Sequence, residues 1–322
     1  MDMRPNSRTG LADLSSIIYL GAVWGAAFLF FRVASPEVGP IWTAELRIAL
    51  AGAILAACIG PRRVWALRHH AGRLVILGAT FSAIPFSLLA FATLTLPSSL
   101  ASLLMATTPL FTALVGAAWL RQRPTRRVVA GLGVGFTAVL LLLGGGATVS
   151  GPAALAAVAA GLLAAFSYAV AGTYAHRAFA GVEPLDLATG QLLGGAAVLL
   201  PVALQSGAPG VPALDGAVSI LLVAVVSTAI AWPVYFRIAA RTNATSASTP
   251  TFLVPMFGMA WGSLLLGEPI GPRLLAAFGL VIVGLILVLP LPLAVARGRL
   301  TEALRGGRAR PATAASRDLA PS

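Results

Sequence analysis

Two ionisable side chains stand inside an otherwise apolar stretch of the sequence, residues 40–59. Arg47 lies on the order of 10 Å along a helix from the start of this stretch, at 1.5 Å per residue. A charged group at such depth in a membrane costs about 2.5–3.5 kcal/mol on insertion scales, so it should face the interior and find a partner. Two roles fit Arg47. It could anchor a substrate carboxylate or a gate, or it could be a structural arginine that carbonyls, an acidic neighbour or snorkelling to the surface satisfies.

Glu45 is the second of these ionisable residues. On a helix, Glu45 and Arg47 point about 200° apart, so they need different partners. Arg32, at the end of the preceding apolar stretch, could reach Glu45 across the short SPEVGP turn and form an ion pair. The alternative is that Glu45 binds a coupling proton. We therefore expect Glu45 and Arg32 to act in a gate or in coupling.

Further side chains in apolar stretches are of types that could line a substrate site. Gln191 is a strong candidate because an amide in the middle of a membrane helix needs a partner. Aromatic residues in membranes also fill packing gaps or form interfacial belts, which is the alternative for the rings in this set. The candidates besides Arg47 are Trp24, Phe86, Tyr168, Gln191, Ser227, Thr228, Trp232 and Tyr235.

Two prolines interrupt the apolar stretches near their middles, Pro109 and Pro255. Each removes a helical hydrogen bond and clashes with the preceding turn, so kinks are expected at both. The kinks could act as hinges that open a cavity to alternate sides, or they could be fixed bends needed for packing.

The sequence contains no group of residues with the types and spacing of a catalytic, metal or cofactor site. Cys58 is the only cysteine, and His69, His70 and His176 do not have the spacing of a metal site. A Walker motif is absent, so ATP is no direct drive. We therefore expect no catalytic residue, no metal, no cofactor and no enzymatic activity.

The composition indicates the kind of structure that positions these residues. Of the 322 residues, 58% are hydrophobic and only 10% are charged, which lies outside the range of soluble domains. Ten continuous apolar stretches reach the roughly 20 residues with which a helix crosses about 30 Å of hydrocarbon. The predicted fold class is all-α, a polytopic membrane bundle of ten transmembrane helices. The expected spans are 14–33, 40–59, 74–93, 99–120, 127–145, 152–173, 186–205, 217–236, 244–266 and 274–292.

The arginines predict the orientation of the chain. All 22 basic residues are arginine, and 19 of them fall in the termini and in alternate loops on one side of the predicted spans. This is the positive-inside pattern, so both termini are predicted to be cytoplasmic. The net charge of +12 then indicates contact with anionic lipid head groups rather than with nucleic acid.

A shift of 146 positions brings the two halves of the chain into register. It pairs Phe86 with Trp232 and Pro109 with Pro255, whereas an offset near 144 pairs Arg47 with Gln191. Each half holds five predicted spans, an odd number, so the halves should be inverted repeats. Chance similarity of Leu- and Ala-rich sequence is the alternative.

Several segments carry a resemblance to a known family. WGAAFLFFR (24–32), AELRIALAG (44–52), VVSTAIAWPVYFR (225–237) and FLVPMFGMAWGSLLLGEPI (252–270) resemble the EamA branch of the drug/metabolite transporter superfamily, bacterial amino-acid and metabolite exporters in particular. This resemblance implies ten helices in two inverted repeats around a central cavity, with the fifth and tenth helices peripheral.

The predicted spans and the arginine pattern divide the chain into a cytoplasmic segment 1–13, a first EamA-like repeat 14–145, a second EamA-like repeat 152–292 and an arginine-rich cytoplasmic tail 293–322, whose composition predicts disorder. The sequence departs from the family where Arg121 and Gln122 replace a glycine and a glutamate. The second repeat keeps Gly267 and Glu268, and Glu268 is expected to cap or hydrogen-bond at the turn into the last helix.

Gly131 and Gly135 form a small-xxx-small ridge on the fifth predicted helix, 127–145. The ridge could pack against another helix or against a second subunit, and a homodimer through the fifth and tenth helices is one partner that we expect. The other expected partners are a small-molecule substrate and membrane lipid.

The expected function is a secondary transporter of the inner (cytoplasmic) membrane that exports amino acids, aromatic or hydrophobic ones in particular, or related metabolites by alternating access. An importer or an uncoupled facilitator of another small metabolite would use the same architecture. A membrane-embedded enzyme or a scaffold without transport is the alternative from another class. Direction, coupling and oligomeric state are left open by the sequence.

Overall fold

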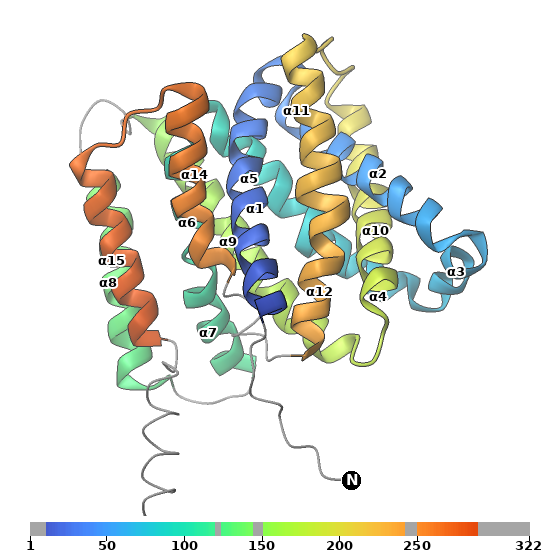
Figure 1. Cartoon of the computed structure of the whole chain (residues 1–322), viewed down its shortest axis with the longest axis horizontal. Helices are drawn as coiled ribbons and strands as arrows, with labels where there is room; N and C mark the ends of the chain where they lie inside the picture. The colour runs from blue at the N-terminus through green and yellow to red at the C-terminus, as the bar shows by residue number, and fades with distance from the viewer. Residues whose placement is uncertain (1–10, 120–123, 144–150, 242–249, 289–322) are drawn as a thin grey trace, which may run out of the picture. The chain divides into compact units, whose positions relative to one another are not determined.

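The computed structural model describes residues 11–119, 124–143, 151–241 and 250–288, which belong to one compact unit that ends at Val288. The regular secondary structure of these residues is helical, and no strand occurs among them (Figure 1). The predicted tail 293–322 and most of the predicted segment 1–13 lie outside the described residues. Arg121 and Gln122 lie outside them as well.

The helices follow one another along the chain with short connections. Two of the elements, η2 and η3, are π-helical turns inside longer helices, and η1 is a 3₁₀ turn. The elements are α1 (Leu11–Val38), α2 (Pro40–Ile59), α3 (Pro61–Ala66), η1 (Leu67–His70), α4 (Ala71–Gly78), η2 (Ala79–Ala83), α5 (Ile84–Thr95), α6 (Ser98–Met105), α7 (Thr108–Trp119), α8 (Arg126–Leu143), α9 (Pro152–Ala178), α10 (Pro184–Gln205), α11 (Leu214–Ala224), η3 (Val225–Ile230), α12 (Ala231–Arg241), α14 (Pro250–Leu266) and α15 (Pro272–Val288).

These elements make ten helical segments in the described residues, one for each predicted span. The main difference lies in the third segment, which was predicted to begin at residue 74 but is helical from Pro61 onward. Between Pro61 and Gly72 the sequence has no glycine or further proline, and it is rich in Arg, Ala and Leu, which favour a helix. The arginine-rich connection is therefore helical rather than a loop.

Glycine–proline pairs set the starts of several helices. Gly39 and Gly151 both have a φ of 87°, a backbone conformation that residues with a side chain rarely adopt. Pro40 and Pro152 follow them at the first helical position, where a proline loses no helical hydrogen bond. The chain thus reverses at the glycine and enters the next helix at the proline.

Seven of the helical segments are long and apolar enough to cross a membrane, judged by length and composition. The other three, α8, α14 and α15, have 17 or 18 described residues each. Large hydrophobic side chains such as Leu140 and Leu264 are exposed on the outside of the bundle, which is expected where the surroundings are lipid. The chain is therefore a multi-pass membrane protein.

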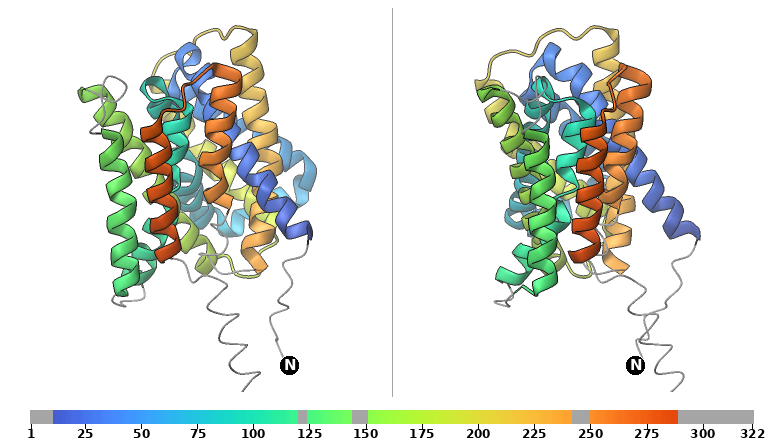
Figure 2. Two further views of the ribbon diagram at one scale, coloured as in Figure 1. Left: turned by 60° about the vertical axis from the view of Figure 1, so that its left-hand side comes forward. Right: turned by 90° about the vertical axis from the view of Figure 1, so that its left-hand side faces the viewer.

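The pair α8 and α15 lies at the edge of the bundle, where the two helices run side by side (Figures 1 and 2). A Cβ added at Gly284 of α15 would meet the Gly131 carbonyl at 2.7 Å and the Gly135 nitrogen at 3.0 Å. The glycine ridge of α8 is thus used against α15 of the same chain. A homodimer through these helices stays a prediction, and the ridge no longer supports it.

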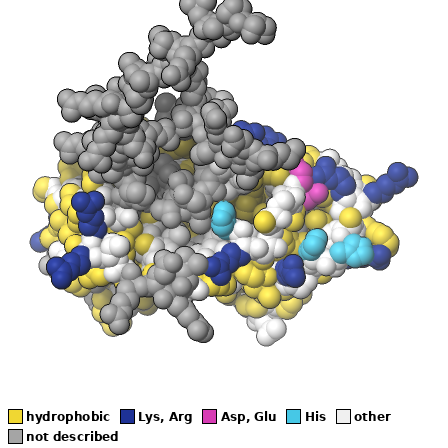
Figure 3. All heavy atoms as spheres, turned by 90° about the horizontal axis from the view of Figure 1, so that it is seen from below, with side chains coloured by type: hydrophobic (Ala, Val, Ile, Leu, Met, Phe, Trp, Pro, Cys, Tyr) yellow, Lys and Arg dark blue, Asp and Glu magenta, His cyan; other side chains and the backbone are white. Residues whose placement is uncertain are grey.

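The arginine-rich ends of the helices gather on one face. In Figure 1, α8 begins and α9 and α12 end at the lower side, and their terminal turns carry Arg126, Arg177 and Arg241. Figure 3 looks onto this lower face and shows arginine and histidine side chains spread across it. The arrangement agrees with the alternate-loop pattern of the sequence.

Candidate functional site

A cavity with about 790 Å³ of empty space, including the open space at its mouth, lies among α1, α2, η2, α5, α6, α7, α9, α12 and α14. Five of the predicted site residues line it: Trp24, Arg47, Tyr168, Trp232 and Tyr235. The lining is therefore largely aromatic, with one guanidinium.

Thr228 and Ser227 hold the Arg47 side chain from η3. The Arg47 Nε donates to Thr228 Oγ1 at 2.7 Å, and Nη2 lies 3.5 Å from the Ser227 carbonyl. Thr228 in turn donates to the Val223 carbonyl at 2.6 Å, which fixes its hydroxyl as an acceptor for Arg47. Ser227 and Thr228 do not line the cavity themselves but position Arg47 in it.

Two phenylalanine rings cover the faces of the same guanidinium. Its Cζ lies 3.6 Å from the ring centroid of Phe86 and 5.1 Å from that of Phe31. A desolvated cation–π contact contributes about 2 kcal/mol or more, so these rings offset part of the cost of burying the charge. Phe86, predicted as a lining residue, is 1% exposed and supports Arg47 from behind.

Arg47 has no acidic partner among the described residues. Only 3% of it is exposed, and no carboxylate of the described chain lies within ion-pair distance. Its Nη1 makes no hydrogen bond to any described residue. The cavity therefore carries an uncompensated positive charge with a free donor group.

Gln191 makes a contact that mirrors that of Arg47. Its Oε1 accepts from Ser82 Oγ at 2.9 Å, and Ser82 belongs to η2 as Thr228 belongs to η3. Residues 82 and 228 are separated by the 146 positions that relate the two halves, and residues 47 and 191 by 144. The same polar contact between a helix and a π turn thus occurs twice, although Gln191 is fully buried and does not line the cavity.

Arg32 does not pair with Glu45, contrary to the sequence prediction. Its Nη1 donates to the carbonyls of Thr93 and Leu96, both at 3.0 Å, and its Nε lies 3.6 Å from Glu268 Oε1. The end of α5 leaves these carbonyls without helical partners, which makes them strong acceptors for a guanidinium. Arg32 therefore contacts α5 and the second half of the chain instead of Glu45.

Glu268 caps a helix, as predicted, but a helix of the other half. It accepts from the Ser98 N–H at 2.8 Å, the Ser98 hydroxyl at 2.6 Å and the Ser99 N–H at 3.1 Å, at the first turn of α6. A carboxylate there also interacts favourably with the helix dipole. Together with Arg32, Glu268 ties α1, α6 and the α14–α15 turn at one end of the cavity.

Glu45 is buried on another face of α2. It is 3% exposed, and its Oε2 has no hydrogen-bond partner. Gly52 lies seven residues further along, on the same side of the helix, and a Cβ there would be 3.5 Å from the Leu192 Cβ of α10. Glu45 therefore faces α10, away from Arg47 and outside the cavity lining.

The two prolines differ in their effect. The helix is interrupted just before Pro109, because α6 ends at Met105 and α7 begins at Thr108. Pro109 has no N–H to give to the Met105 carbonyl, and Met105 lines the cavity. By contrast, α14 runs from Pro250 to Leu266 without interruption at Pro255.

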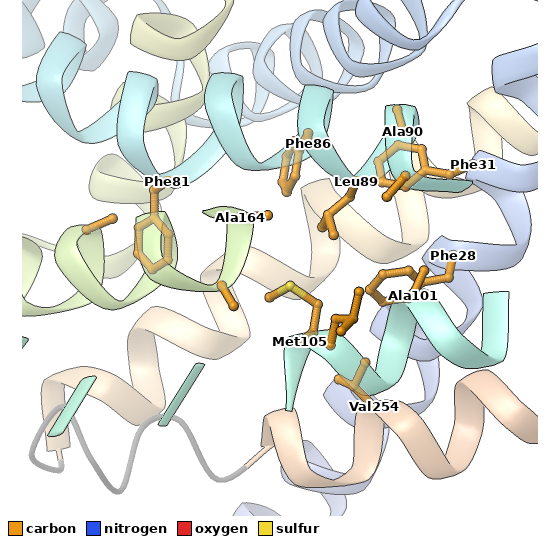
Figure 4. Close-up of a cluster of buried hydrophobic side chains, with 14 of the residues drawn as sticks. Phe28, Phe31, Phe81, Phe86, Leu89, Ala90, Ala101, Met105, Ala164 and Val254 are labelled. Atoms are coloured by element: carbon orange, nitrogen blue, oxygen red, sulfur yellow. The ribbon is translucent and has the colours of Figure 1, made fainter. Parts of the chain in front are cut away.

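Several lining residues were missed from the sequence, among them Phe81, Thr108 and Phe28. Figure 4 shows Met105, Leu89 and Phe28 pointing into the same space from α6, α5 and α1. Thr108 stands directly before Pro109, so the predicted helix break could have pointed to it. Phe81 and Phe28 carry no such signal in the sequence.

A second cavity adjoins the first one on the side of the arginine-rich helix ends. Gly172 and Tyr235 line both spaces, and the second also borders His176, Glu183 and Ala240 at the ends of α9, α10 and α12. The Arg32 and Glu268 cluster lies on the other helix ends, where α5 ends and α6 begins. The second cavity thus lies next to the central one, at the arginine-rich ends of the helices.

Comparisons with known proteins agree with this arrangement. The sequence profile described as the EamA-like transporter family matches the chain twice, over residues 14–144 and 155–289. A solved crystal structure shares the fold, with a TM-score of 0.58 at 19% identity over 85% of this chain and 96% of the other.

Two curated relatives cover most of the chain. A transporter of Archaeoglobus fulgidus described as uncharacterised is 25% identical over 82% of this chain and 94% of its own length. A probable terminal-alkyne amino-acid exporter of Streptantibioticus cattleyicolor is 28% identical over 85% of this chain and 92% of its own length. The family and these relatives are transporters, not enzymes.

Proposed function

The chain belongs to the EamA-like transporter family, and on this premise we propose that it is a secondary carrier that exports amino acids with aromatic or other hydrophobic side chains, or closely related metabolites. The observation that carries the proposal is Arg47, a buried cation without an acidic partner in a cavity lined by aromatic rings. A substrate carboxylate would supply the missing counter-charge through charge-assisted hydrogen bonds. The aromatic walls suit an apolar side chain.

The curated relatives give indirect support to the proposed substrate class. One of them is described as a probable amino-acid exporter, and the similarity spans nearly the whole of both chains. The similarity is too low to transfer the substrate, so the amino-acid assignment rests on the cavity of this chain together with that relative.

We also propose that the two halves are inverted repeats that work by alternating access. The family profile matches twice, and each match contains five of the ten helical segments. The repeat-related contacts Arg47–Thr228 and Gln191–Ser82 support the same relation. An odd number of spans in each half would place the second half upside down in the membrane.

The sides of the membrane follow from the arginines. We propose that the lower face in Figure 3 is cytoplasmic and that both termini lie on this side of the inner membrane. The second cavity then opens to the cytoplasm, and the Arg32–Glu268 cluster closes the outer side. This is the state in which an exporter would load its substrate.

For Glu45 we propose the coupling role, because Arg32 is engaged elsewhere. A carboxylate that is buried among apolar helices without a partner is expected to hold a proton, and its release would need water or a counter-charge. No described charged group on the helices that pack against α2 makes an ion pair with it. Those groups are Arg32 and Glu37 on α1, Arg62 and Arg63 on α3, Asp186 on α10 and Asp215 on α11.

One experiment tests transport and coupling together. Purified protein is reconstituted into vesicles loaded with labelled L-phenylalanine, and efflux is followed with and without an imposed pH gradient. We expect efflux faster than that from loaded vesicles without the protein, and we expect the pH gradient to accelerate this efflux. In Glu45→Gln, efflux should persist but lose its response to the gradient, because an amide cannot carry the proton.

The outcomes separate the alternatives. Absence of flux for a panel of labelled amino acids would count against the proposed function. Flux that ignores the gradient in the wild type would indicate an uncoupled facilitator, and uptake favoured over efflux would indicate an importer. A gradient response that survives in Glu45→Gln would remove Glu45 from the coupling mechanism.

A further inference from the structure

The only charge on the lining of the central cavity is positive. Arg47 is the only ionisable cation among its lining residues, and none of these residues is Asp or Glu. The internal segments outside the description, 120–123, 144–150 and 242–249, also contain no Asp or Glu in their sequence. A positively charged group that enters the cavity would therefore meet a like charge and no carboxylate.

Glu45 is buried outside the cavity lining, and the other described carboxylates have partners elsewhere. Glu37 accepts from the Ala213 N–H at 2.8 Å, and Glu268 caps α6. Asp186 pairs with Arg63 at 2.7 Å on the surface of the bundle. None of them can reach into the cavity without breaking these contacts.

Two buried polar atoms in the cavity wall have no partner. Trp232 Nε1 and Thr108 Oγ1 both lack a hydrogen bond to any described residue, and the two residues are 2% and 5% exposed. Indole Nε1 can only donate, whereas a hydroxyl can donate or accept. The Trp232 Nε1 and the Arg47 Nη1 are thus unpaired donors that line the same cavity, which is what a site for an oxyanion requires.

Aromatic rings form a contiguous part of the cavity wall. The centroids of Trp24, Trp232 and Tyr235 lie 5.4–5.6 Å from one another. Rings at such distances are in direct contact. They offer a continuous apolar surface for a hydrocarbon or aromatic body.

We propose that the cavity recognises a carboxylate and an apolar body and does not require an α-ammonium group, so that aromatic and other hydrophobic monocarboxylic acids are ligands alongside the amino acids. This inference rests on the proposed function and sets its chemical limits. Arg47 and Trp232 bind the carboxylate, and Thr108 completes the polar end of the site. An amine of the same shape without the carboxylate is excluded by the charge of Arg47.

Three ligands with the same ring and chain length test this selectivity. Isothermal titration of the purified protein with L-phenylalanine, 3-phenylpropanoate and 2-phenylethylamine avoids the passive leak of weak acids through vesicles. We expect 3-phenylpropanoate to bind within about tenfold of phenylalanine, a difference of one neutral hydrogen bond or less. For 2-phenylethylamine we expect no measurable heat.

The results distinguish this inference from the proposed function. If phenylalanine binds while 3-phenylpropanoate does not, or if the amine binds as tightly as the acid, the inference fails and the amino-acid carrier stands. If neither the amino acid nor the acid binds, both are overturned.

A conservative variant tests the role of the unpaired indole. Trp232→Phe keeps an aromatic ring in the wall but removes the Nε1 donor together with the second ring of the indole, so binding of the acid and of the amino acid should weaken by about tenfold or more. Trp42→Phe is the matched control, because the Trp42 Nε1 donates to the Gly207 carbonyl away from the cavity. Equal affinities in Trp232→Phe and Trp42→Phe would show that the indole binds no carboxylate.

Discussion

Replacing Arg47 by methionine is expected to abolish most transport while leaving the protein folded. Removing one member of a buried charge pair costs about 2–5 kcal/mol, which corresponds to a fall in kcat/KM of about 30-fold or more. The substrate carboxylate would then enter an apolar pocket without its guanidinium partner. Stability should not decrease, because methionine fills a similar space between Phe31 and Phe86 without a buried charge.

Two variants make the Arg47 result specific. Arg47→Lys keeps the charge but has no Nε to bind Thr228 and no planar face for Phe86, so partial activity is expected. Arg73→Met removes an exposed arginine of α4 and should transport like the wild type. Initial transport rates, measured over a range of substrate concentrations, give kcat/KM for each variant. An unchanged kcat/KM in Arg47→Met would mean that the substrate binds elsewhere.

The second large effect is expected at Gly78, where α4 crosses α10. A Cβ at this position would stand 2.7 Å from the Gly194 carbonyl carbon and would also clash with the Gly195 nitrogen and the Gln191 carbonyl. These are backbone atoms, which can give way only if the helices separate. Gly78→Ala should therefore destabilise the protein by about 1–3 kcal/mol or more, as overpacking of a core does.

The control for Gly78 is on the same helix. Gly72 has nothing within 4 Å of an added Cβ, so Gly72→Ala should leave the thermal midpoint unchanged or raise it slightly. Thermal unfolding of the two variants in the same detergent compares them directly. Equal midpoints would contradict the tight crossing of α4 and α10.

The helices could be predicted from the sequence because a membrane span needs about 20 consecutive apolar residues, and the sequence shows such stretches directly. The depth of Arg47 could be predicted from its position within the apolar stretch 40–59. The relation between residues 47 and 191 could be predicted from the match between the two halves of the sequence. The structure adds that each of these side chains contacts a π turn of the other half.

The faces of the helices could not be predicted equally well. A π turn holds an extra residue, so the side chains after η2 are rotated from where a regular helix would place them. Phe86 follows η2 and stands behind Arg47 instead of in the cavity wall. Phe81, within η2, lines the cavity and was missed.

The partners of Arg32 and Glu268 were also beyond the sequence. Arg32 is near Glu45 along the chain, whereas its contacts lie 61 and 64 residues away at the end of α5. Glu268 caps a helix that begins 170 residues earlier. No local pattern encodes such contacts, because they depend on which helices become neighbours in the folded bundle.

The most direct test of the central claim is an experimental structure of the protein with a transported amino acid bound. The account predicts the substrate carboxylate within hydrogen-bond distance of the Arg47 guanidinium and the Trp232 indole, with its side chain against Trp24 and Tyr235. A substrate bound outside this cavity, or one whose carboxylate points away from Arg47, would contradict it.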